Sequence, residues 1–386
     1  MAKWFEKRLD EIAEFNPRES LKKGSIAKKI SMDKLQPFCR DVPGVELEPY
    51  SGGTKFRNGD TIMARITPCL ENGKTAKVSV LENGEVGFGS TEYIVFRAKD
   101  GCDPDFLYYL VTSPIVRGPA IKSMVGSSGR QRVQTDVVQK LMVKVPDLGA
   151  QKTISGILKS LDDKIAANRK INDNLEQQAK ALYKDWFLDF SPFSSDGTLP
   201  DGWRIGTVGD IIQLHDSKRV PLSGTERSKM AKLYPYYGAT SLMDYVDNYL
   251  FDGIYLLLGE DGTVVDNLGF PILQYVYGRF WVNNHAHIIT GKEGFSVEEL
   301  YLFFGLTNIK SIVTGAVQQK VSQQNLKKVP AIIPSSTALS SFDELIQPIF
   351  SQIRNLRDEN ARLTSLRDIL LPKLMSGELD VSAIEL

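Results

Sequence analysis

The sequence has few residues of the kinds that bind metals or form disulfides: three cysteines and three histidines among 386 residues. Cys39, Cys69 and Cys102 lack paired or metal-ligand spacing, so we interpret them as reduced thiols of a cytoplasmic protein. No apolar run approaches the ~18 residues of a membrane span. Basic and acidic residues number 47 each, which argues against a polycationic nucleic-acid coat but allows local basic patches.

Motifs for catalysis are also scarce. An amino-methyltransferase needs an Asn/Asp-Pro-Pro-aromatic loop around its flipped base, and the chain contains no Pro-Pro pair. The stretch 72–75, Asn-Gly-Lys-Thr, lacks the first glycine of a phosphate loop. His285 and His287 have no carboxylate or cysteine cluster nearby in sequence, so we interpret them as polar strand residues. Glu260 and Asp261 precede a glycine and are interpreted as turn residues. We expect no catalytic site, cofactor or metal in this chain.

Two segments, 132–146 and 320–334, share a pattern although few of their residues are identical. Both begin with a cation followed by valine, and both end in alternating apolar residues that are typical of a half-buried strand. Much earlier in each half, Trp4 and Trp203 precede short amphipathic segments. This recurring order predicts a duplicated scaffold whose polar surface differs between the copies.

A long helical pattern follows each copy. In both, apolar residues recur in heptads, and an asparagine interrupts the middle of each seam, where it would fix register at a cost in stability. We expect Ser341 to cap the second helix and Pro372 to end or kink it. The predicted seam residues are Ile154, Leu158, Leu161, Ile165, Asn168, Asn172, Leu175, Leu182, Ile353, Leu356, Asn360, Leu363 and Leu370.

The sequence therefore predicts an α+β protein in which two α/β globules alternate with two long helices. We expect the helices to form an antiparallel coiled coil, with an internal pseudo-twofold axis relating the two halves. The alternative is that each helix packs only on its own globule. The predicted domains are a first globule at 1–148, a helix at 149–190, a linker at 191–202, a second globule at 203–335, and a second helix with a C-terminal tail at 336–386.

Several phrases resemble the specificity subunits of type I restriction–modification systems. They are "FRNGDTIMARITPCLENGKTA" (56–76), "PYYGATSLMDYVDNYLFDGIYLLLGEDG" (235–262), "NLEQQAKALYKDWF" (174–187) and "LRDILLPKLMSGELDV" (366–381). The resemblance covers essentially the whole chain. It implies that the two globules are target recognition domains, each reading one half of a split, asymmetric site in double-stranded DNA.

The resemblance also implies partners. In that family the helices dock two modification subunits, which bind S-adenosylmethionine and methylate adenine, and a separate restriction subunit is the ATP-driven motor and nuclease. The sequence leaves open whether a restriction subunit accompanies this chain. It also leaves open a specificity subunit of another methyltransferase-based defence system, and a coiled-coil scaffold that reads no DNA.

Basic and amide side chains near the repeated segments are the candidate DNA contacts, because such groups bind phosphates and base edges. The first-rank candidates are Arg130, Gln131 and Arg132 in the first globule and Gln318, Gln319 and Lys320 in the second. Lys55, Arg57, Arg65 and Lys74 form a second rank. Tyr236 and Tyr237 are read either as an exposed aromatic turn that touches DNA or as core. The alternative for every cation is a solvated surface charge.

Overall fold

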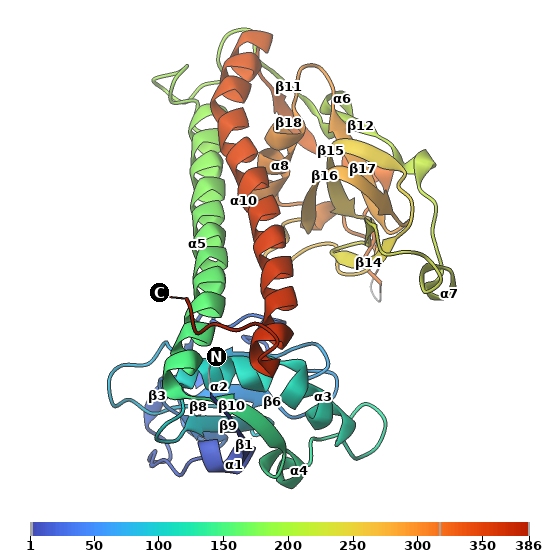
Figure 1. The fold of residues 1–386 in the computed structure, drawn as a ribbon. Helices are drawn as coiled ribbons and strands as arrows, with labels where there is room; N and C mark the ends of the chain where they lie inside the picture. The colour runs from blue at the N-terminus through green and yellow to red at the C-terminus, as the bar shows by residue number, and fades with distance from the viewer. Residues whose placement is uncertain (1–2, 316–317, 385–386) are drawn as a thin grey trace. The chain divides into compact units, whose positions relative to one another are not determined.

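A computed structural model describes residues 3–315 and 318–384 of the chain. The protein divides into two compact units. Unit 1 is the chain up to Lys170 together with the segment from Arg357 onward, and unit 2 is Ile171–Leu356. Both points of division fall inside long helices, so each unit holds one globule and a length of each helix (Figure 1).

The two long helices are α5 (Leu148–Phe187) and α10 (Ser336–Ser376). The expected cap at Ser341 is wrong, because α10 begins one and a half turns earlier and its first turn is capped by the Ser335 hydroxyl, which accepts from Ala338 N–H at 3.3 Å. The expected end at Pro372 is also wrong. The helix continues for another turn because Leu374 and Met375 are buried in the core of unit 1, which outweighs the hydrogen bond that a proline removes.

In unit 1 the helices run in opposite directions along each other. Near the start of α5, Ile154 shares a core cluster with Leu374 of α10. Further along α5, Asn168 donates to the side chain of Asn360 at 3.0 Å and to that of Glu359 at 2.8 Å. As α5 advances, its partners on α10 therefore move toward lower numbers.

Unit 2 shows the same direction of pairing. Near the end of α5, the rings of Tyr183 and Phe187 lie 5.7 Å and 4.7 Å from the ring of Phe342, which belongs to the start of α10. Across both units, seven predicted seam residues are buried: Ile154, Leu158, Ile165, Asn168, Asn172, Ile353 and Leu356. Ala179, at a further heptad position of α5, is buried as well. Leu161, Leu175, Leu182, Asn360, Leu363 and Leu370 are half-buried.

The globule of unit 1 contains two four-stranded sheets and a two-stranded ribbon. The sheet orders are β2-β9-β6-β7 and β4-β3-β8-β5, and the ribbon pairs β1 with β10. The strands are β1 (Trp4–Arg8), β2 (Ala13–Phe15), β3 (Ile26–Ile30), β4 (Glu46–Pro49), β5 (Thr54–Phe56), β6 (Thr61–Ala64), β7 (Thr75–Lys77), β8 (Gly87–Gly89), β9 (Tyr93–Ala98) and β10 (Met142–Pro146). The short helices are α1 (Leu9–Ile12), α2 (Pro104–Thr112), α3 (Pro114–Lys122) and α4 (Thr135–Gln139).

The globule of unit 2 contains one six-stranded sheet, β12-β17-β15-β16-β13-β14, and a ribbon of β11 with β18. Its strands are β11 (Arg204–Thr207), β12 (Ile212–Leu214), β13 (Tyr234–Tyr237), β14 (Leu242–Val246), β15 (Phe251–Gly259), β16 (Leu273–Val282), β17 (Ala286–Gly291) and β18 (Pro330–Ile333). Its helices are α6 (Val208–Ile211), α7 (Gly224–Arg227), α8 (Val297–Leu306) and α9 (Gln323–Lys327), with 3₁₀ turns η1 (Asp216–Lys218) and η2 (Lys310–Ile312).

Both globules arrange their strands in the same order. The order β2-β9-β6-β7 in unit 1 matches β12-β17-β15-β16 in unit 2, and the parallel pair β3·β8 with its antiparallel neighbour β4 matches β13·β16 with β14. In unit 2 two long strands, β15 and β16, take the places of four short strands in unit 1, which explains why one sheet corresponds to two.

The repeated phrases supply the last strand of each globule. On β10, Val143 and Val145 are buried, whereas the neighbouring Met142 is 55% exposed. On β18, Ala331 and Ile333 are buried. The alternation predicted from the sequence is therefore confirmed. β10 pairs with β1, which begins at Trp4, and β18 pairs with β11, which follows Trp203. Each of these two-stranded ribbons closes its globule just before a long helix begins.

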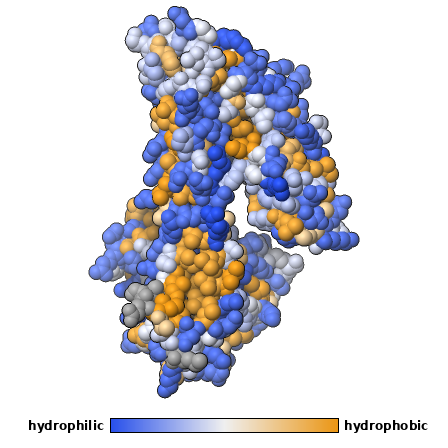
Figure 2. All heavy atoms as spheres, turned by 45° about the horizontal axis from the view of Figure 1, so that its top comes forward, coloured by the Kyte–Doolittle hydropathy of each residue, from blue (hydrophilic) through white to orange (hydrophobic). Residues whose placement is uncertain are grey.

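The surface mixes hydrophilic and hydrophobic residues (Figure 2). Large apolar side chains are exposed on the edge hairpins of both globules: Ile26 and Leu47 on β3 and β4, and Leu242, Met243 and Tyr245 on β14. Within the described part of the chain, none of the helices combines the length and the hydrophobicity that crossing a membrane requires.

Candidate nucleic-acid interface

The first repeated phrase is preceded by a hairpin in unit 1, which we call the first hairpin (Val125–Arg132). Val125 and Arg132 exchange backbone hydrogen bonds of 3.0 and 2.9 Å. Gly126 and Gly129 have positive φ values of 134° and 78°, which lets the chain reverse direction between them. The next residue, Val133, donates to the carbonyl of Arg65 at 2.8 Å, so the hairpin is fixed to the end of β6 while its tip is exposed.

Glu92 holds the side chain of Arg132. Nε of Arg132 lies 3.0 Å from both carboxylate oxygens, and its Nη2 donates to Oε1 at 2.7 Å. Nε of Arg65 lies 3.9 Å from the same carboxylate. Hydrogen bonding from Arg132 lowers the pKa of Glu92, so the carboxylate stays ionised at neutral pH. We call Arg65, Glu92 and Arg132 the first node.

In unit 2 the described residues Thr314, Gly315 and Gln318–Lys320, which we call the second hairpin, have the same place. Thr314 and Lys320 exchange backbone hydrogen bonds of 2.9 and 2.7 Å, and Val321 donates to the carbonyl of Glu260 at 2.8 Å. Glu260 N–H in turn donates to the carbonyl of His285 at 2.8 Å, just as Arg65 N–H donates to Glu92 at 2.9 Å in unit 1. Glu260, His285 and Lys320, the second node, therefore occupy the backbone positions of Arg65, Glu92 and Arg132.

The charges of the second node are arranged differently. The carboxylate comes from the end of β15, where Glu260 contacts Lys320 at 3.4 Å and accepts from Arg219 at 2.7 Å. His285 pairs with Asp261 at 2.7 Å. The sequence predicts turn roles for Glu260 and Asp261; the structure adds that Glu260 pairs with Lys320 within the node and with Arg219 beside it.

A buried hydrogen-bonded pair, Asp216 and His287, anchors the base of the second hairpin. Nδ1 of His287 lies 2.6 Å from the carboxylate of Asp216, and its Nε2 lies 2.8 Å from the carbonyl of Val321. Asp216 also accepts from Ile288 N–H and from Gln323. Burial opposes ionisation of Asp216, but the hydrogen bond from His287 and further donors lower its pKa overall. Both ring nitrogens of His287 therefore lie within hydrogen-bonding distance of an oxygen atom, one from a carboxylate and one from a backbone carbonyl.

The distances of this cluster would also suit a metal. One ligand atom each from Asp216, Glu260 and His287 lie within 4.8 Å of one another, although the sequence places no carboxylate near the histidine. In the structure Arg219 already contacts both carboxylates, at 2.7 Å for Glu260 and 3.6 Å for Asp216. The guanidinium supplies the positive charge that a metal would bring, so we interpret the cluster as an ion-pair network.

A cleft of about 750 Å³ opens beside the second hairpin. Gln318 and Gln319 line one part of it, and Lys310 and Val313 line another. The cleft is also lined by Gly262, Thr263 and 265–267, and Gly262 ties this segment to the hairpin by donating to the carbonyl of Gln319 at 3.0 Å. The two predicted glutamines are thus exposed in a hollow with polar walls.

The second-rank cations of unit 1 are mostly engaged in the fold. The ammonium of Lys74 donates to the carbonyl of Met32 at 2.9 Å, and that of Lys55 donates to the carbonyl of Glu19 at 2.6 Å. Arg57 pairs with the buried carboxylate of Glu19 at 2.7 Å. Lys55 also lines a groove of about 490 Å³ with residues 16–20. Only Arg65 of this group lies at a node.

The two tyrosines belong to a strand and not to an exposed turn, so that part of the expectation is wrong. Tyr236 is 1% exposed, its hydroxyl accepts from Leu222 N–H at 3.0 Å, and Arg227 stacks on its ring. The ring of Tyr237 lies 5.9 Å from that of Phe280 in a hydrophobic cluster. Tyr236 is therefore a core residue, because its side chain lies on the buried face of β13.

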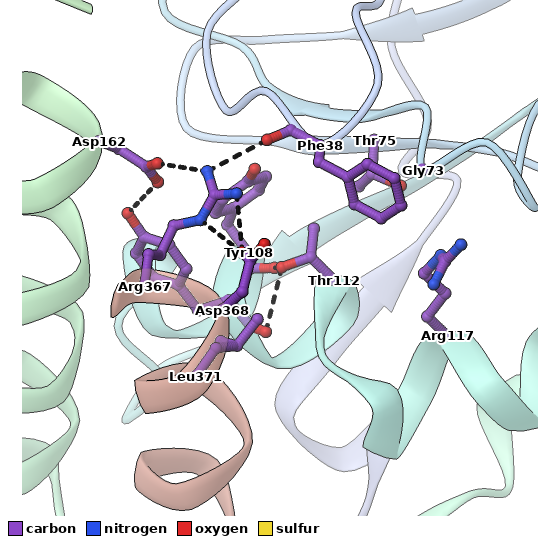
Figure 3. Close-up of a pocket in the computed structure, with 11 residues that line it drawn as sticks. Phe38, Gly73, Thr75, Tyr108, Thr112, Arg117, Asp162, Arg367, Asp368 and Leu371 are labelled. Atoms are coloured by element: carbon purple, nitrogen blue, oxygen red, sulfur yellow. Dashed lines mark hydrogen bonds and ion pairs between the residues drawn. The ribbon is translucent and has the colours of Figure 1, made fainter. Parts of the chain in front are cut away.

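A small pocket of about 40 Å³ lies in unit 1, where the two helices meet the globule (Figure 3). Asp162 on α5 and Arg367 on α10 face each other across it at 2.8 Å, and Tyr109 donates to the same carboxylate at 2.7 Å. The carbonyl of Phe38 accepts from Arg367 at 3.2 Å. These groups satisfy one another, so the pocket is part of a buried joint that fixes both helices to the globule.

Sequence reasoning misses Glu92, Asp216, Arg219 and Glu260 as parts of these sites. Glu92 and Arg132 are 40 residues apart, and Asp216 and His287 are 71 residues apart. No local pattern marks such pairs. The signal available in the sequence is the cation that opens each repeated phrase, which locates the hairpins but not their acidic partners.

The fold and the sites define a protein with two like-built binding modules, each joined to two long helices. A family model described as the type I restriction modification DNA specificity domain matches residues 1–177 and 200–365. The chain belongs to this family, whose members provide the sequence specificity of type I restriction–modification systems.

Individual relatives agree. The chain is 25% identical over 316 residues to the specificity subunit of the type I restriction enzyme MjaIX from Methanocaldococcus jannaschii, covering 74% of this chain and 71% of the relative. It is 24% identical to the HindI specificity subunit from Haemophilus influenzae, covering 88% and 90%. The crystal structure of a type I restriction–modification S subunit from M. genitalium has the same fold, with a TM-score of 0.56, 16% identity, and coverage of 97% and 96%.

Proposed function

We propose that this chain is the non-catalytic DNA-reading subunit of a type I restriction–modification complex, and that each unit reads one half of a split, asymmetric site. The observation that carries the proposal is the repeated node. The same backbone hydrogen bonds hold a hairpin in each unit, yet the side chains differ between the two. Two readers of different half-sites need this combination, because base contacts carry the sequence information while the scaffold only positions them.

The first-rank side chains support this assignment by their exposure. Arg132 and Lys320 expose 46% and 52% of their side chains, although each has a carboxylate partner. Arg130 is exposed on the first hairpin, and Gln318 and Gln319 line the cleft of the second. Arginine and glutamine are the side chains that bind guanine and adenine edges in the major groove. Lys55 and Arg57, which lie near the groove at 16–20, would contact the DNA backbone.

The helices are proposed to form one antiparallel coiled coil with pseudo-twofold symmetry. Opposite directions of pairing within each unit, buried seam residues, and the Asn168–Asn360 contact near the middle of both helices support this arrangement. The matching strand orders support an internal repeat.

The partners are proposed from family membership. Two modification subunits would dock on the helices and supply both S-adenosylmethionine and the methyl transfer to adenine. A restriction subunit would join where the system also cleaves DNA. The chain itself would bring no cofactor.

A methylation assay tests this function. The pure chain with S-adenosylmethionine should transfer no methyl group to DNA, and adding its modification subunits should produce adenine methylation at one split site. A footprint of the complex should show two protected patches separated by an unprotected spacer. Methyl transfer by the pure chain would contradict the non-catalytic role, and a single continuous or sequence-independent footprint would favour a scaffold.

A further inference from the structure

The guanidinium of Arg132 is held from one side only. Glu92 takes the Nε edge and one hydrogen of Nη2, with three contacts between 2.7 and 3.0 Å. The remaining contact, from Nη1 to the carbonyl of Arg130, is 3.5 Å long and therefore weak. The terminal edge formed by Nη1 and Nη2 keeps hydrogens for another acceptor. A fork in this orientation matches O6 and N7 of guanine, which accept two hydrogen bonds from one arginine.

The carboxylate is suited to remain in place when DNA binds. Both of its oxygens already accept from Arg132, and Arg65 lies 3.9 Å away, so two cations offset its charge beside phosphates. Glu92 is also attached to the scaffold, because its carbonyl accepts from Arg65 N–H and its own N–H donates to Ser90. Because Glu92 already holds the side chain of Arg132, the arginine loses less rotamer freedom when it binds DNA.

We propose that Glu92 is a positioning residue that holds Arg132 to read a guanine in the first half-site. The inference rests on the proposed function and adds to it a base and the residue pair that selects it. The second node differs in chemistry at this point. Lys320 is a point charge without a planar fork and contacts Glu260 at 3.4 Å, so the equivalent position in the second half-site is selected less sharply.

Three other roles for Glu92 give different results. If the carboxylate masks Arg132 until DNA displaces it, removing its charge would tighten binding to all sequences. If Glu92 itself accepts from cytosine N4, the preference at its position would be for cytosine and would survive loss of the arginine fork. If Arg132 only contacts a phosphate, its loss would weaken all sequences alike and reduce the salt dependence.

The experiment uses the full chain together with its modification subunits. Binding is measured by fluorescence anisotropy on duplexes that carry each of the four bases at every position of both half-sites. The variants are Arg132→Ala, Arg132→Lys and Glu92→Gln, and Lys320→Arg is the matched change at the second node. Circular dichroism of each variant verifies folding, which the backbone hydrogen bonds of the first hairpin should preserve.

Arg132→Ala should reduce the preference for guanine at one position by about 5- to 150-fold. Arg132→Lys should lose most of that preference while keeping the salt dependence, because it keeps the charge without the fork. Glu92→Gln should relax the same position by a smaller factor and leave the other positions unchanged. Lys320→Arg should change selectivity only in the second half-site.

Tighter binding of all sequences by Glu92→Gln, uniform weakening by Arg132→Ala, or a cytosine preference that survives Arg132→Lys would each overturn the proposal. These results would still leave unit 1 as the reader of the first half-site. If Arg132→Ala instead changed selectivity in the second half-site, the proposed function itself would fail.

Discussion

The two units build the same backbone and fill it with different chemistry. At equivalent places in β9 and β17, unit 1 has the buried apolar residue Ile94 and unit 2 has the buried His287. At the third position of α2 and α8, unit 1 has Phe106 and unit 2 has Glu299, and both are fully buried. Unit 1 thus stabilises these places by apolar packing, whereas unit 2 uses polar groups that depend on partners and on pH.

This difference predicts which substitutions destabilise each unit most. When a buried apolar side chain is truncated, the protein loses stability in proportion to the cavity that is left. When one partner of a buried charged pair is removed, the loss of stability is larger, because the remaining charge has neither water nor a counterion. Substitutions that exchange one kind of chemistry for the other therefore test the comparison.

The largest effect is expected at the Asp216–His287 pair. Asp216→Ala should destabilise unit 2 by about 3–5 kcal/mol, because the buried ring of His287 and the N–H of Ile288 would lose their acceptor and Arg219 would lose one of its two carboxylate partners. The double variant Asp216→Leu/His287→Leu, which imitates the apolar choice of unit 1, should recover part of this loss. Urea unfolding of the full chain measures the stability, and amide hydrogen exchange at Ile288, whose N–H donates to Asp216, locates the change. Unaltered exchange there in Asp216→Ala would mean that the pair does not anchor the second hairpin.

A smaller, pH-dependent effect is expected at Glu299. Burial raises its pKa to about 8 from an ordinary value of 4.5, and one of its oxygens is buried without a hydrogen-bond partner. Between pH 4.5 and pH 8 the unfolded chain ionises this group while the folded chain keeps it protonated. Its contribution therefore falls as pH rises, by roughly 1.4 kcal/mol per pH unit inside that window.

Glu299→Gln should remove this slope, since glutamine keeps an acceptor for the N–H of Ser296. The variant should match the wild type near pH 5 and exceed it by on the order of 1–4 kcal/mol at pH 8. Glu226→Gln is the control, because Glu226 has the same capping position in α7 but is exposed. Thermal unfolding at pH 5 and pH 8 gives the comparison, and a Glu299→Gln variant equally stable to wild type at both pH values would contradict the raised pKa.

The smallest effect is expected where the helices pair. Asn168→Leu should destabilise unit 1 by about 1–2 kcal/mol, because the half-buried side chain of Asn360 would lose its donor. Replacing both asparagines by leucine should be neutral or stabilising. A double-mutant cycle by thermal unfolding tests this pairing, and strictly additive effects would show that the two amides do not interact.

The sequence predicts the periodic features best. The heptads place the buried seam, and the alternation in the repeated phrases places β10 and β18, because both patterns are local. The start of α10 is missed, since packing of Ala338 and Leu339 into the core extends the helix beyond the capping motif at Ser341. Glu92 and Glu260 are missed because each lies at the end of a strand that is distant in sequence from the hairpin and reaches it only in the folded chain.

The most direct test of the central claim is to sequence the methylated adenines produced by the full chain with its modification subunits. The comparison is between the wild type, the variant Arg130→Ala/Arg132→Ala, and the variant Gln318→Ala/Lys320→Ala. Two independent readers predict that the first variant relaxes only one half of the site and the second relaxes only the other, with the same spacer between them. If either variant changed both halves, the assignment of one unit to one half-site would be contradicted.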